Sequence, residues 1–434
     1  MPARAGTAVR SLGGIPDVVP GTMASLRAAV DYLRYLESPF ENSDYLRRRS
    51  ERTLPPSWAF LTRIGRLPRV VVGGAIRLMR VVESCVAPDA GLVQWIKSVA
   101  PDVVFLSPLV TLGPSGDRQT ELVKAARAAR VPIVVGVASW DHLTSKGLVR
   151  IVPDMLLVWN EAQAVEANEL HRIPRARVAI TGAQSFDHWF EPPQAGTQSA
   201  FRARLGISND RRVVLFVGSS RNMAPGDSEV EFVRRWIGAL RASPRPELQQ
   251  AFLLVRPHPT NTEPWAGVAL GPDTVVLPDR YSGIPLSDDE VETFRQSLLA
   301  SAAVVGINTT AMIEAAILDR PVLTVRDPAF AHSQEQTLHF GHLPTSGGGF
   351  VTVAASMAEH VEQLDDVLRN PGQVADARRR FVRRFVRPLG LETPATLSVI
   401  GALERAADAG FRSASRTESG GAADALAHHG GPAQ

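Results

Sequence analysis

The segment from Ala302 to Val325 limits the possible folds of this chain more than any other stretch of its sequence. Its first part, Ala302 to Ile307, is a short apolar run rich in β-branched residues, which is typical of a strand buried on both faces of a parallel sheet. Residues 311–317 then form a predicted helix, which the pair Arg320-Pro321 ends before a second buried strand. A strand, a turn, a helix and a strand in this order predict an α/β fold with a parallel sheet.

The turn between this strand and this helix can bind an anion. Asn308, Thr309 and Thr310 are residue types that often cap helices, and the free N–H groups of a first helical turn carry a partial positive charge. A phosphate can bind there, while Glu314, one turn into the helix, can accept both hydroxyl groups of a ribose. The simpler alternative is that Thr310 caps the helix and Glu314 only complements the helix dipole.

Length and composition favour a protein of two α/β domains. The 434 residues, 44% of them hydrophobic, are too many for one core. The net charge is only +3, so nothing calls for a nucleic-acid partner. Cys85 is the single cysteine, which excludes an intrachain disulfide and a cysteine-rich metal site. No apolar run reaches the ~18 residues of a membrane-spanning helix and no signal-peptide pattern occurs, so we expect a cytoplasmic protein.

The order of the predicted elements divides the chain. Strands and helices alternate from Gly91 and again from Val213, which favours two α/β units. Both ends are rich in glycine and alanine without periodicity, so we expect them to be disordered. The predicted parts are a disordered start (1–21), a first domain (22–190), a linker with two prolines (191–212), a second domain (213–372), further helices (373–407) and a disordered tail (408–434).

The start of the first domain is less regular. An amphipathic pattern over 24–47 predicts a helix in two pieces that breaks near Pro39. Further on, Pro68 and the pair Gly73-Gly74 argue against one continuous helix over 61–83. A short strand at 69–72 is the alternative, and it would be the first domain's opening strand.

A loop rich in chemically active side chains follows one strand of the first domain. It reads ASWDHLTSKG, residues 138–147, and lies where ligands bind in open parallel sheets. Asp141 and His142 can act as a general base or an orienting pair, Lys146 can meet a phosphate, and Trp140 can stack on a ring. Alternatively the loop begins a helix, with Asp141 or a nearby serine as its cap, Trp140 in the core and Lys146 in solvent.

Two more strand ends carry candidate residues. Asn160 and Glu161 follow the next strand and can face the cleft, although N-capping with an acidic first turn explains them as well. The first strand of the second domain ends in Gly218, Ser219 and Ser220, where a glycine lets backbone N–H groups come close to a ligand. A Gly-Ser-Ser turn is common, so this motif alone indicates little.

The tetrapeptide Arg256-Pro257-His258-Pro259 ends another predicted strand. The two prolines restrict the backbone around His258, whose imidazole can then bind a phosphate or a leaving-group oxygen. Arg256 can form paired hydrogen bonds with the same diphosphate. Tyr281, after the following strand, offers an aromatic face for stacking. A histidine with a purely structural role is the alternative for His258.

Three histidines that follow the segment 302–325 suggest a metal site at first sight. The spacing of His332, His339 and His342 matches neither HExxH nor a set completed by cysteine, so we predict no metal there. We expect instead a loop that closes over the ligand, with His339 in contact with a substrate.

The run GINTTAMIEAAILDRPVLTV, residues 306–325, resembles the nucleotide-binding segment of the GT-B superfamily. That superfamily of two-Rossmann-domain enzymes includes UDP-glycosyltransferases, glycogen phosphorylase-like enzymes, the non-hydrolysing UDP-N-acetylglucosamine 2-epimerase and CDP-glycerol glycerophosphotransferases. ASWDHLTSKG, VWNEAQ, TGAQSFD and RPHP together resemble a group of mostly uncharacterised bacterial GT-B-like proteins. The likeness covers roughly residues 100–405.

The resemblance implies a fold and a set of roles. The two Rossmann-like domains would face each other across a cleft, with the acceptor on the first, the nucleotide donor on the second, and the C-terminal helices crossing back to the first. Glu314 would bind the ribose, and residues 308–310 would form the loop on the phosphate side, without a metal ion. The loop at residues 218–220 would approach the donor diphosphate. Nucleobases in this superfamily lie near the region of Tyr281.

We therefore expect a glycosyltransferase-like enzyme that transfers a sugar, or a related group, from a nucleotide-diphosphate donor to an acceptor hydroxyl, without a further cofactor. The acceptor would be a saccharide or a lipid-linked saccharide, as in the synthesis of cell-surface polysaccharide or glycolipid. Arg256, Thr309 and Thr310 would neutralise the departing diphosphate, His258 would assist its departure, and Asp141 or His142 would take the acceptor proton.

Two other functions stay open. A nucleotide-sugar epimerase would share the donor half, and a non-catalytic nucleotide-binding or scaffold protein would share only the fold. The arginine-rich run at 378–384 leaves a further choice, because it alternates with apolar residues. It is either a solvated helix face or a peripheral contact with anionic lipid headgroups at the inner face of a membrane.

Overall fold

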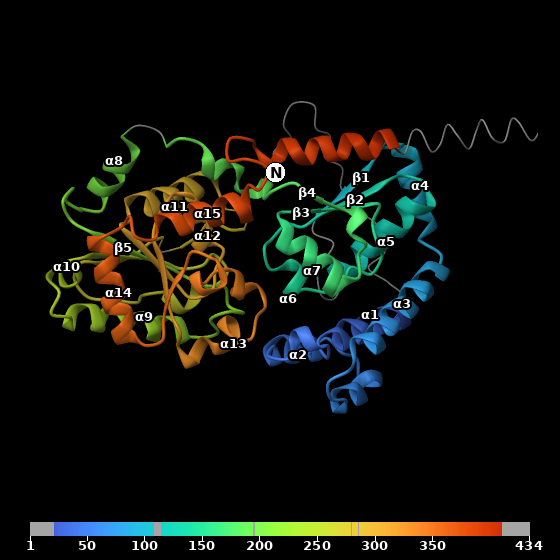
Figure 1. Cartoon of the computed structure of the whole chain (residues 1–434), viewed down its shortest axis with the longest axis horizontal. Helices are drawn as coiled ribbons and strands as arrows, with labels where there is room; N and C mark the ends of the chain where they lie inside the picture. The colour runs from blue at the N-terminus through green and yellow to red at the C-terminus, as the bar shows by residue number, and fades with distance from the viewer. Residues whose placement is uncertain (1–20, 108–113, 194–195, 279, 285, 410–434) are drawn as a thin grey trace, which may run out of the picture.

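Two parallel sheets, one in each lobe, organise the chain (Figure 1). The computed structural model describes residues 21–107, 114–193, 196–278, 280–284 and 286–409. The ends predicted to be disordered lie outside these residues, except that Gly21 begins a helix and residues 408–409 end one.

Every strand predicted from residue 103 onward is present, and every strand pairing is parallel. The first sheet has the order β1-β2-β3-β4, and the second has the order β10-β9-β8-β5-β6-β7. The unit at 302–325 is confirmed as β8, helix α12 (Ala311–Ile317) and β9. The strands are β1 Val104–Leu106, β2 Ile133–Gly136, β3 Met155–Val158, β4 Val178–Ile180, β5 Val213–Val217, β6 Phe252–Arg256, β7 Thr274–Val276, β8 Ala303–Gly306, β9 Val322–Val325 and β10 Thr352–Ala354. The expected α/β class with two Rossmann-like domains, each built on a parallel sheet, is confirmed.

Helices cover both faces of the six-stranded sheet. Leu215 and Val217 of β5 pack on one face, and Val214 and Phe216 pack on the other. This burial on both sides explains why the strands read as continuous apolar runs. One face is covered by α8 (Thr197–Arg204), α11 (Asp288–Ala300) and α12, and the other by α9 (Ser228–Ala242), α10 (Pro246–Gln249) and α14 (Met357–Arg369).

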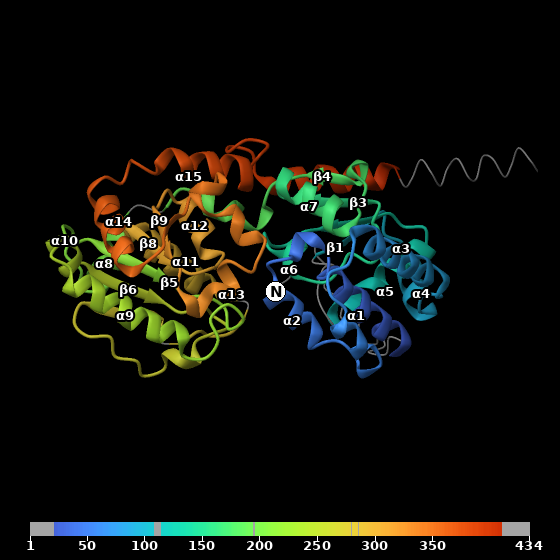
Figure 2. The ribbon, with the colours of Figure 1, turned by 60° about the horizontal axis from the view of Figure 1, so that its bottom comes forward.

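The four-stranded sheet receives the end of the chain. One of its faces packs on α4 (Ala90–Val99), α5 (Pro114–Ala128) and α7 (Glu161–His171). The other packs against the helix at 395–409, whose buried Val399, Ala402 and Ala406 meet Val134 and Leu157 of the sheet. Figure 2 shows this last helix running along the first lobe after the chain has left the second lobe at α15. The expectation that terminal helices cross back is confirmed.

Helices precede the first strand. The predicted break near Pro39 is confirmed, because a 3-10 turn at Ser38–Phe40 separates α1 from α2. The strand suggested at 69–72 is wrong, because these residues open a helix of seventeen residues, α3. Its buried positions recur at helical spacing and pack mainly on α1, which outweighs the cost of two internal glycines. The bounds are α1 Gly21–Arg34, α2 Asp44–Glu51 and α3 Arg69–Cys85.

Part of the range predicted as a linker belongs to the second lobe. Residues 197–204 form α8, which packs on α11. The side chain of Gln198 donates a hydrogen bond to the carbonyl of Leu299 at 2.6 Å, and Arg202 donates one to the carbonyl of Ala300 at 3.2 Å. The irregular connection is therefore shorter than 191–212.

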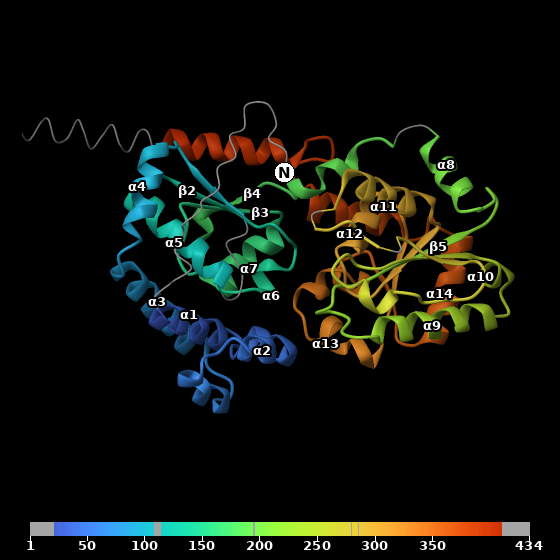
Figure 3. The ribbon, with the colours of Figure 1, turned by 180° about the vertical axis from the view of Figure 1, so that it is seen from behind.

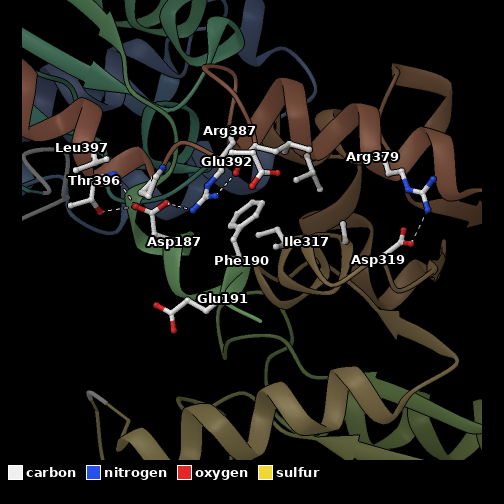
Figure 4. Close-up of a pocket in the computed structure, with 14 residues that line it drawn as sticks. Asp187, Phe190, Glu191, Ile317, Asp319, Arg379, Arg387, Glu392, Thr396 and Leu397 are labelled. Carbon is white, nitrogen blue, oxygen red and sulfur yellow. Dashed lines mark hydrogen bonds and ion pairs between the residues drawn. The ribbon is translucent and has the colours of Figure 1, made fainter. Parts of the chain in front are cut away.

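Asp187 joins the last helix to the rest of the structure. Its carboxylate accepts hydrogen bonds from the backbone N–H groups of Ala395 (2.9 Å) and Thr396 (2.8 Å), and from the guanidinium of Arg387 at 2.7 Å (Figure 4). Asp187 thus caps the helix at 395–409 from outside its own segment. These bonds lower the pKa of Asp187 despite an opposing effect of burial.

The contact of Asp187 with Arg387 and the helix at 395–409 is called the joint below. A cavity of about 790 Å³ opens beside it (Figure 4). Two arginines line it, and each has an aspartate partner within the chain. Arg387 pairs with Asp187 at 2.7 Å, and Arg379 pairs with Asp319 at 3.4 Å. Arg387 therefore has its own counter-charge inside the structure, whereas Arg379 shares Asp319 with Arg378.

The arginine-rich run forms α15 (Ala375–Phe381) and a π-helical turn (Val382–Val386). Phe381 and Phe385 are 1% and 3% exposed and belong to the core of the second lobe. Arg378 pairs with Asp319 at 2.9 Å, and Arg384 donates to the carbonyl of Gly348. The proposed lipid contact is corrected accordingly, because its apolar half is buried in protein. Within the described ranges, every helix is too short or too polar to cross a bilayer.

Candidate functional site

A pocket of about 110 Å³ lies where the carboxyl ends of both sheets meet. The loops after β5, β6 and β8 form one wall, and the loop after β2 faces them, as expected for ligand sites in open parallel sheets. A side chain of α2 and one from the segment after β9 complete it. The lining residues are Arg49, Trp140, Asp141, Lys146, Ser220, Asn222, Met223, His258, Asn308, Thr309, Thr310 and His339.

The loops after β5 and β6 approach each other closely at Gly218. A Cβ atom at this position would lie 2.8 Å from the backbone nitrogen of His258, so only glycine fits. The N–H of Gly218 donates to the carbonyl of Arg256 at 2.8 Å. This approach places Ser220 and His258 in the same wall, whereas Ser219 is buried behind it.

His258 presents an uncharged hydrogen-bond donor to the pocket. The backbone N–H of Thr260 donates to its Nδ1 atom at 3.1 Å. Because Nδ1 accepts this bond, the proton of the neutral imidazole is on Nε2. Burial lowers the pKa of His258 to about 4, so the ring is neutral at pH 7. His258 can therefore donate to an anion without carrying charge itself.

The loop after β8 brings residues 308–310 into the pocket. Thr310 precedes α12, but its side chain makes no capping hydrogen bond, so the simpler alternative for this residue is wrong. Its Oγ1 atom instead accepts a hydrogen bond from the indole of Trp140 at 3.2 Å. The side chain of Asn308 donates to the carbonyl of Ser333 at 2.6 Å. Trp140 and Thr310 thus connect the two walls.

Asp141 organises the facing loop. Its carboxylate accepts hydrogen bonds from the hydroxyls of Ser139 (2.6 Å) and Ser145 (2.8 Å), and it lies 3.5 Å from Nζ of Lys146. Burial raises the pKa of Asp141, but Lys146, the neighbouring histidines and Ser139 together hold it well below its usual range. Asp141 is consequently ionised at neutral pH, and its charge is balanced by Lys146.

His339 closes the pocket from the segment after β9. It is 3% exposed, and its ring packs edge-on against Trp140 with centroids 4.8 Å apart. Its Nδ1 atom lies 3.2 Å from the hydroxyl of Thr144, and its Nε2 atom lies 3.5 Å from the amide of Asn308. Burial lowers the pKa of His339 to about 4. The predicted cleft position of His339 agrees with this geometry.

Arg49 is a lining residue that the sequence did not reveal. It is on α2, outside both sheets, and its Nε and Nη2 atoms are buried without a hydrogen-bond partner among the described residues. A buried guanidinium nitrogen without a partner is costly, so this group favours an anionic ligand. Three successive arginines at 47–49 were visible in the sequence, but nothing in their spacing indicated which of them points into the pocket.

Arg256 and Tyr281 lie behind the pocket rather than in its lining. Arg256 is 3% exposed, donates to the hydroxyl of Ser297 at 3.1 Å and stacks over Phe294 at 5.2 Å. Tyr281 donates to the carbonyl of Pro257 at 2.8 Å. The structure therefore corrects the assignment of Arg256 to a diphosphate and leaves Arg49 and Lys146 as the lining cations.

Glu314 also lies outside the lining residues. It is one helical turn beyond Thr310, beside Trp189. Burial raises the pKa of Glu314 to about 8, and the indole of Trp189 offsets this only in part. Two hydroxyl groups of a ribose would supply hydrogen bonds that favour the ionised form.

Three further candidates are placed elsewhere. His142 is 9% exposed, outside the lining, and its Nδ1 atom has no partner among the described residues. Asn160 accepts from the N–H of Gln163 and donates to the carbonyl of Phe385, as a cap that also binds the second lobe. Glu161 is exposed and pairs with Arg175 at 3.1 Å. The capping alternative is right for Asn160.

Glu229 is a buried carboxyl group that sequence reasoning did not single out. It is 1% exposed, in the first turn of α9, and accepts from the N–H of Ser219 at 2.8 Å. Burial raises the pKa of Glu229 to about 8, and its other oxygen lies where a Cβ of Gly218 would be 3.1 Å away. Glu229 supports the loop after β5 from behind.

The three histidines considered for a metal site point to different partners. His332 packs on Tyr45, His339 packs on Trp140, and His342 lies 2.7 Å from Glu166. Among the residues that the structure describes, no group of three His, Cys, Asp or Glu side chains is arranged to hold a metal ion.

No family model and no curated protein matches the chain. Similar solved structures include the UDP-GlcNAc 2-epimerase from Neisseria meningitidis bound to UDP-GlcNAc, with 15% identity and a TM-score of 0.46 over 73% of this chain and 80% of that one. HepE from Anabaena in complex with UDP has 14% identity and a TM-score of 0.43 over 73% and 81%. The wall teichoic acid polymerase TagF has 11% identity and a TM-score of 0.38 over 61% of this chain and 59% of its own. At these values the likenesses carry no conclusion about activity.

Proposed function

We propose that the chain is a glycosyltransferase-like enzyme that transfers a sugar, or a related group, from a nucleoside-diphosphate donor to an acceptor hydroxyl. One observation carries the proposal, namely the uncompensated positive charge of the pocket. Lys146 and Asp141 balance each other, and His258 and His339 are neutral. Arg49 therefore remains without a counter-charge, and a phosphate group would supply it.

The donor phosphates would bind between the two walls. Arg49 and Lys146 would approach them from the first lobe, and residues 309–310 and His258 from the second. Glu314 would bind the ribose one helical turn beyond Thr310, where the hydrogen bonds of the ribose would lower the raised pKa of this carboxyl.

His258 would assist departure of the diphosphate. Its Nε2–H can donate to a phosphate oxygen as negative charge develops there, which stabilises the transition state more than the ground state. The bond between the sugar and the diphosphate breaks, and the acceptor oxygen forms the new bond.

Asp141 would take the proton of the acceptor hydroxyl. It is the single carboxylate among the described lining residues, whereas His142 lies outside them. Its low pKa makes Asp141 a weak base, which suits a transfer in which the acceptor proton leaves late.

A thermal-shift screen against UDP, GDP, CDP, TDP and ADP tests the proposal. A ligand of the native state stabilises it by RT ln(1 + [L]/Kd), so one nucleotide should raise the melting temperature at millimolar concentration. Arg49→Ala should weaken its binding by roughly 10- to 100-fold, since it removes a charge-assisted contact. Arg379→Ala, which removes the same charge beside the larger cavity, should not.

The outcomes separate the functions. Absence of any shift in the wild-type protein would overturn the proposal. Turnover of a nucleotide sugar without a second substrate would identify an epimerase, and binding without turnover in the presence of acceptors would indicate a non-catalytic protein.

A further inference from the structure

We propose that the acceptor carries an anionic group, a phosphate or a carboxylate, which binds to Arg48, Arg49 and Arg52 in a second cavity beside the pocket. The inference rests on the proposed function, because it names the acceptor class for the same site. It follows from a cavity of about 290 Å³ between α2 and the start of the segment after β9. This cavity is lined by Asp44, Tyr45, Arg48, Arg49, Arg52, His332 and Gln336.

The cavity has a defined frame. The backbone N–H of Tyr45 donates to Oε1 of Gln336 at 3.0 Å, and the Tyr45 hydroxyl donates to the carbonyl of Asn222 at 2.8 Å. The ring of Tyr45 packs on His332 with centroids 5.0 Å apart. Figure 3 shows α2 of the first lobe facing α13 (Ala331–Gln334) of the second. Both lobes therefore contribute to this cavity, as they do to the pocket.

The charges that line the cavity are unbalanced. Within the described part of the chain, Arg48, Arg49 and Arg52 form no ion pair. Asp44 is the single lining carboxylate, and it lies 3.3 Å from Arg47. Burial lowers the pKa of His332, so this ring adds no charge at neutral pH. Three guanidinium groups thus face one cavity without an internal partner.

The location of these arginines at the C-terminal end of α2 does not explain the presence of all three. Cations in a last helical turn interact well with the helix dipole, which explains the exposed Arg48 and Arg52. It does not explain Arg49, whose Nε and Nη2 atoms are buried and without hydrogen-bond partners among the described residues. Guanidinium groups form paired hydrogen bonds with carboxylates and phosphates, so an anion of either kind would satisfy these atoms.

Arg49 lines both cavities, which fixes the relation between their ligands. In the proposed function the donor phosphates occupy the smaller pocket. The neighbouring cavity then remains for a group that enters with the acceptor, whose hydroxyl must reach Asp141. A negative charge on that acceptor would bind the arginines and position the hydroxyl.

The test uses glucose 6-phosphate and glucuronate as anionic probes and glucose as the neutral control. Melting temperatures are measured at constant low ionic strength, because surface electrostatics is screened by salt. The nucleotide selected in the screen is present at saturation. We expect at least one anionic probe, but not glucose, to raise the melting temperature of the wild-type protein. The choice between the two probes distinguishes a phosphate from a carboxylate.

The double variant Arg48→Gln/Arg52→Gln should bind the anionic probe about tenfold or more weakly than the wild-type protein, because it lacks two charge-assisted contacts. It should keep the nucleotide shift, since neither residue lines the smaller pocket. Arg379→Gln is the matched control for the loss of charge. The single variants Arg48→Gln and Arg52→Gln serve the same purpose if the double variant does not fold.

Two results would overturn the inference. One is a nucleotide shift in the wild-type protein without a shift from either anionic probe, and the other is unchanged probe affinity in the arginine variants. If no nucleotide raises the melting temperature of the wild-type protein, the proposed function fails instead. Failure of the inference and failure of the proposed function are therefore distinguishable.

Discussion

The cavity beside Asp187 and the candidate pocket, both near the contact between the lobes, differ in how their charges are paired. The larger, of about 790 Å³, has arginines that are both bound to aspartates of the chain. The smaller, of about 110 Å³, contains an arginine with buried nitrogens that lack partners. The arginines of the larger cavity thus have counter-charges within the chain, although Nε of Arg387 also lacks a hydrogen-bond partner among the described residues, whereas Arg49 of the smaller pocket has no ion-pair partner among them. A charge without an internal counter-charge therefore locates the candidate site better than cavity size does.

The largest expected effect tests the smaller pocket. His258→Ala should reduce turnover by about 100- to 1000-fold, because it removes a donor aimed at the developing charge of the leaving group. Initial rates at saturating donor measure this effect. His188→Ala removes an exposed histidine of the joint segment and should leave the rate unchanged. A parallel loss of rate and melting temperature in the His258 variant would indicate a structural role instead.

The next effect tests the joint. Asp187→Ala should lower the free energy of unfolding by about 2–3 kcal/mol, since it removes a cap and leaves Arg387 without its partner. Nucleotide affinity should stay the same, and urea unfolding with a binding titration measures both quantities. Asp366→Ala, in an exposed pair on α14, should change stability by less than about 1 kcal/mol. Equal effects of the two substitutions would contradict the capping role.

The pH dependence of stability tests the lowered pKa of His258, which lines the smaller pocket. The pKa of His258 is lowered to about 4, against about 6.5 for an unfolded chain. Below pH 6.5 the unfolded chain therefore binds a proton that the native protein does not, and stability falls as the pH decreases toward 4. The loss should be about 1 kcal/mol between pH 6.5 and 5.5 for this residue. Urea unfolding at pH 6.5 and 5.5 should show a smaller loss of stability for His258→Ala than for the wild-type protein. An identical loss in both proteins would refute the lowered pKa of His258.

The smallest effect tests the connection between the walls. Trp140→Phe removes the hydrogen bond to Thr310, so nucleotide affinity should fall by roughly 1 kcal/mol, or about fivefold. Trp58→Phe is a matched control, because it removes an indole hydrogen bond to Ser25 that lies within the first lobe. A similar loss of affinity in both variants would show that the bond between the lobes has no special part in binding.

The sequence predicted the second lobe more completely than the first. Its strands are apolar runs bounded by glycine and proline, so their type and order follow from local pattern. The strand suggested at 69–72 was wrong because the prolines and glycines were weighed by local preference alone. The packing of α3 on α1 decides its conformation, and that contact cannot be seen in a local window.

Candidate residues were predictable where strand ends place them. Trp140, Asp141, Lys146, Ser220, His258 and residues 308–310 all line the pocket. The direction of a side chain at a strand end was not predictable, as Arg256 shows by pointing toward α11. Arg49 was missed because it comes from a helix outside both sheets, where no motif marks it. Its role depends on a contact between lobes that is set by tertiary structure.

The last helix also affects how the protein is made. Residues 395–409 cover a face of the sheet formed by 104–180, so this sheet stays partly uncovered until that helix has been synthesised. At typical rates of translation, the delay between the two segments is roughly 10–50 s. Val134 and Leu157, which pack on this helix in the folded protein, would lack that cover during the interval. The nascent chain is therefore a candidate for chaperone binding at this stage. Ribosomes stalled near residue 300 should carry more bound chaperone than ribosomes stalled beyond residue 409.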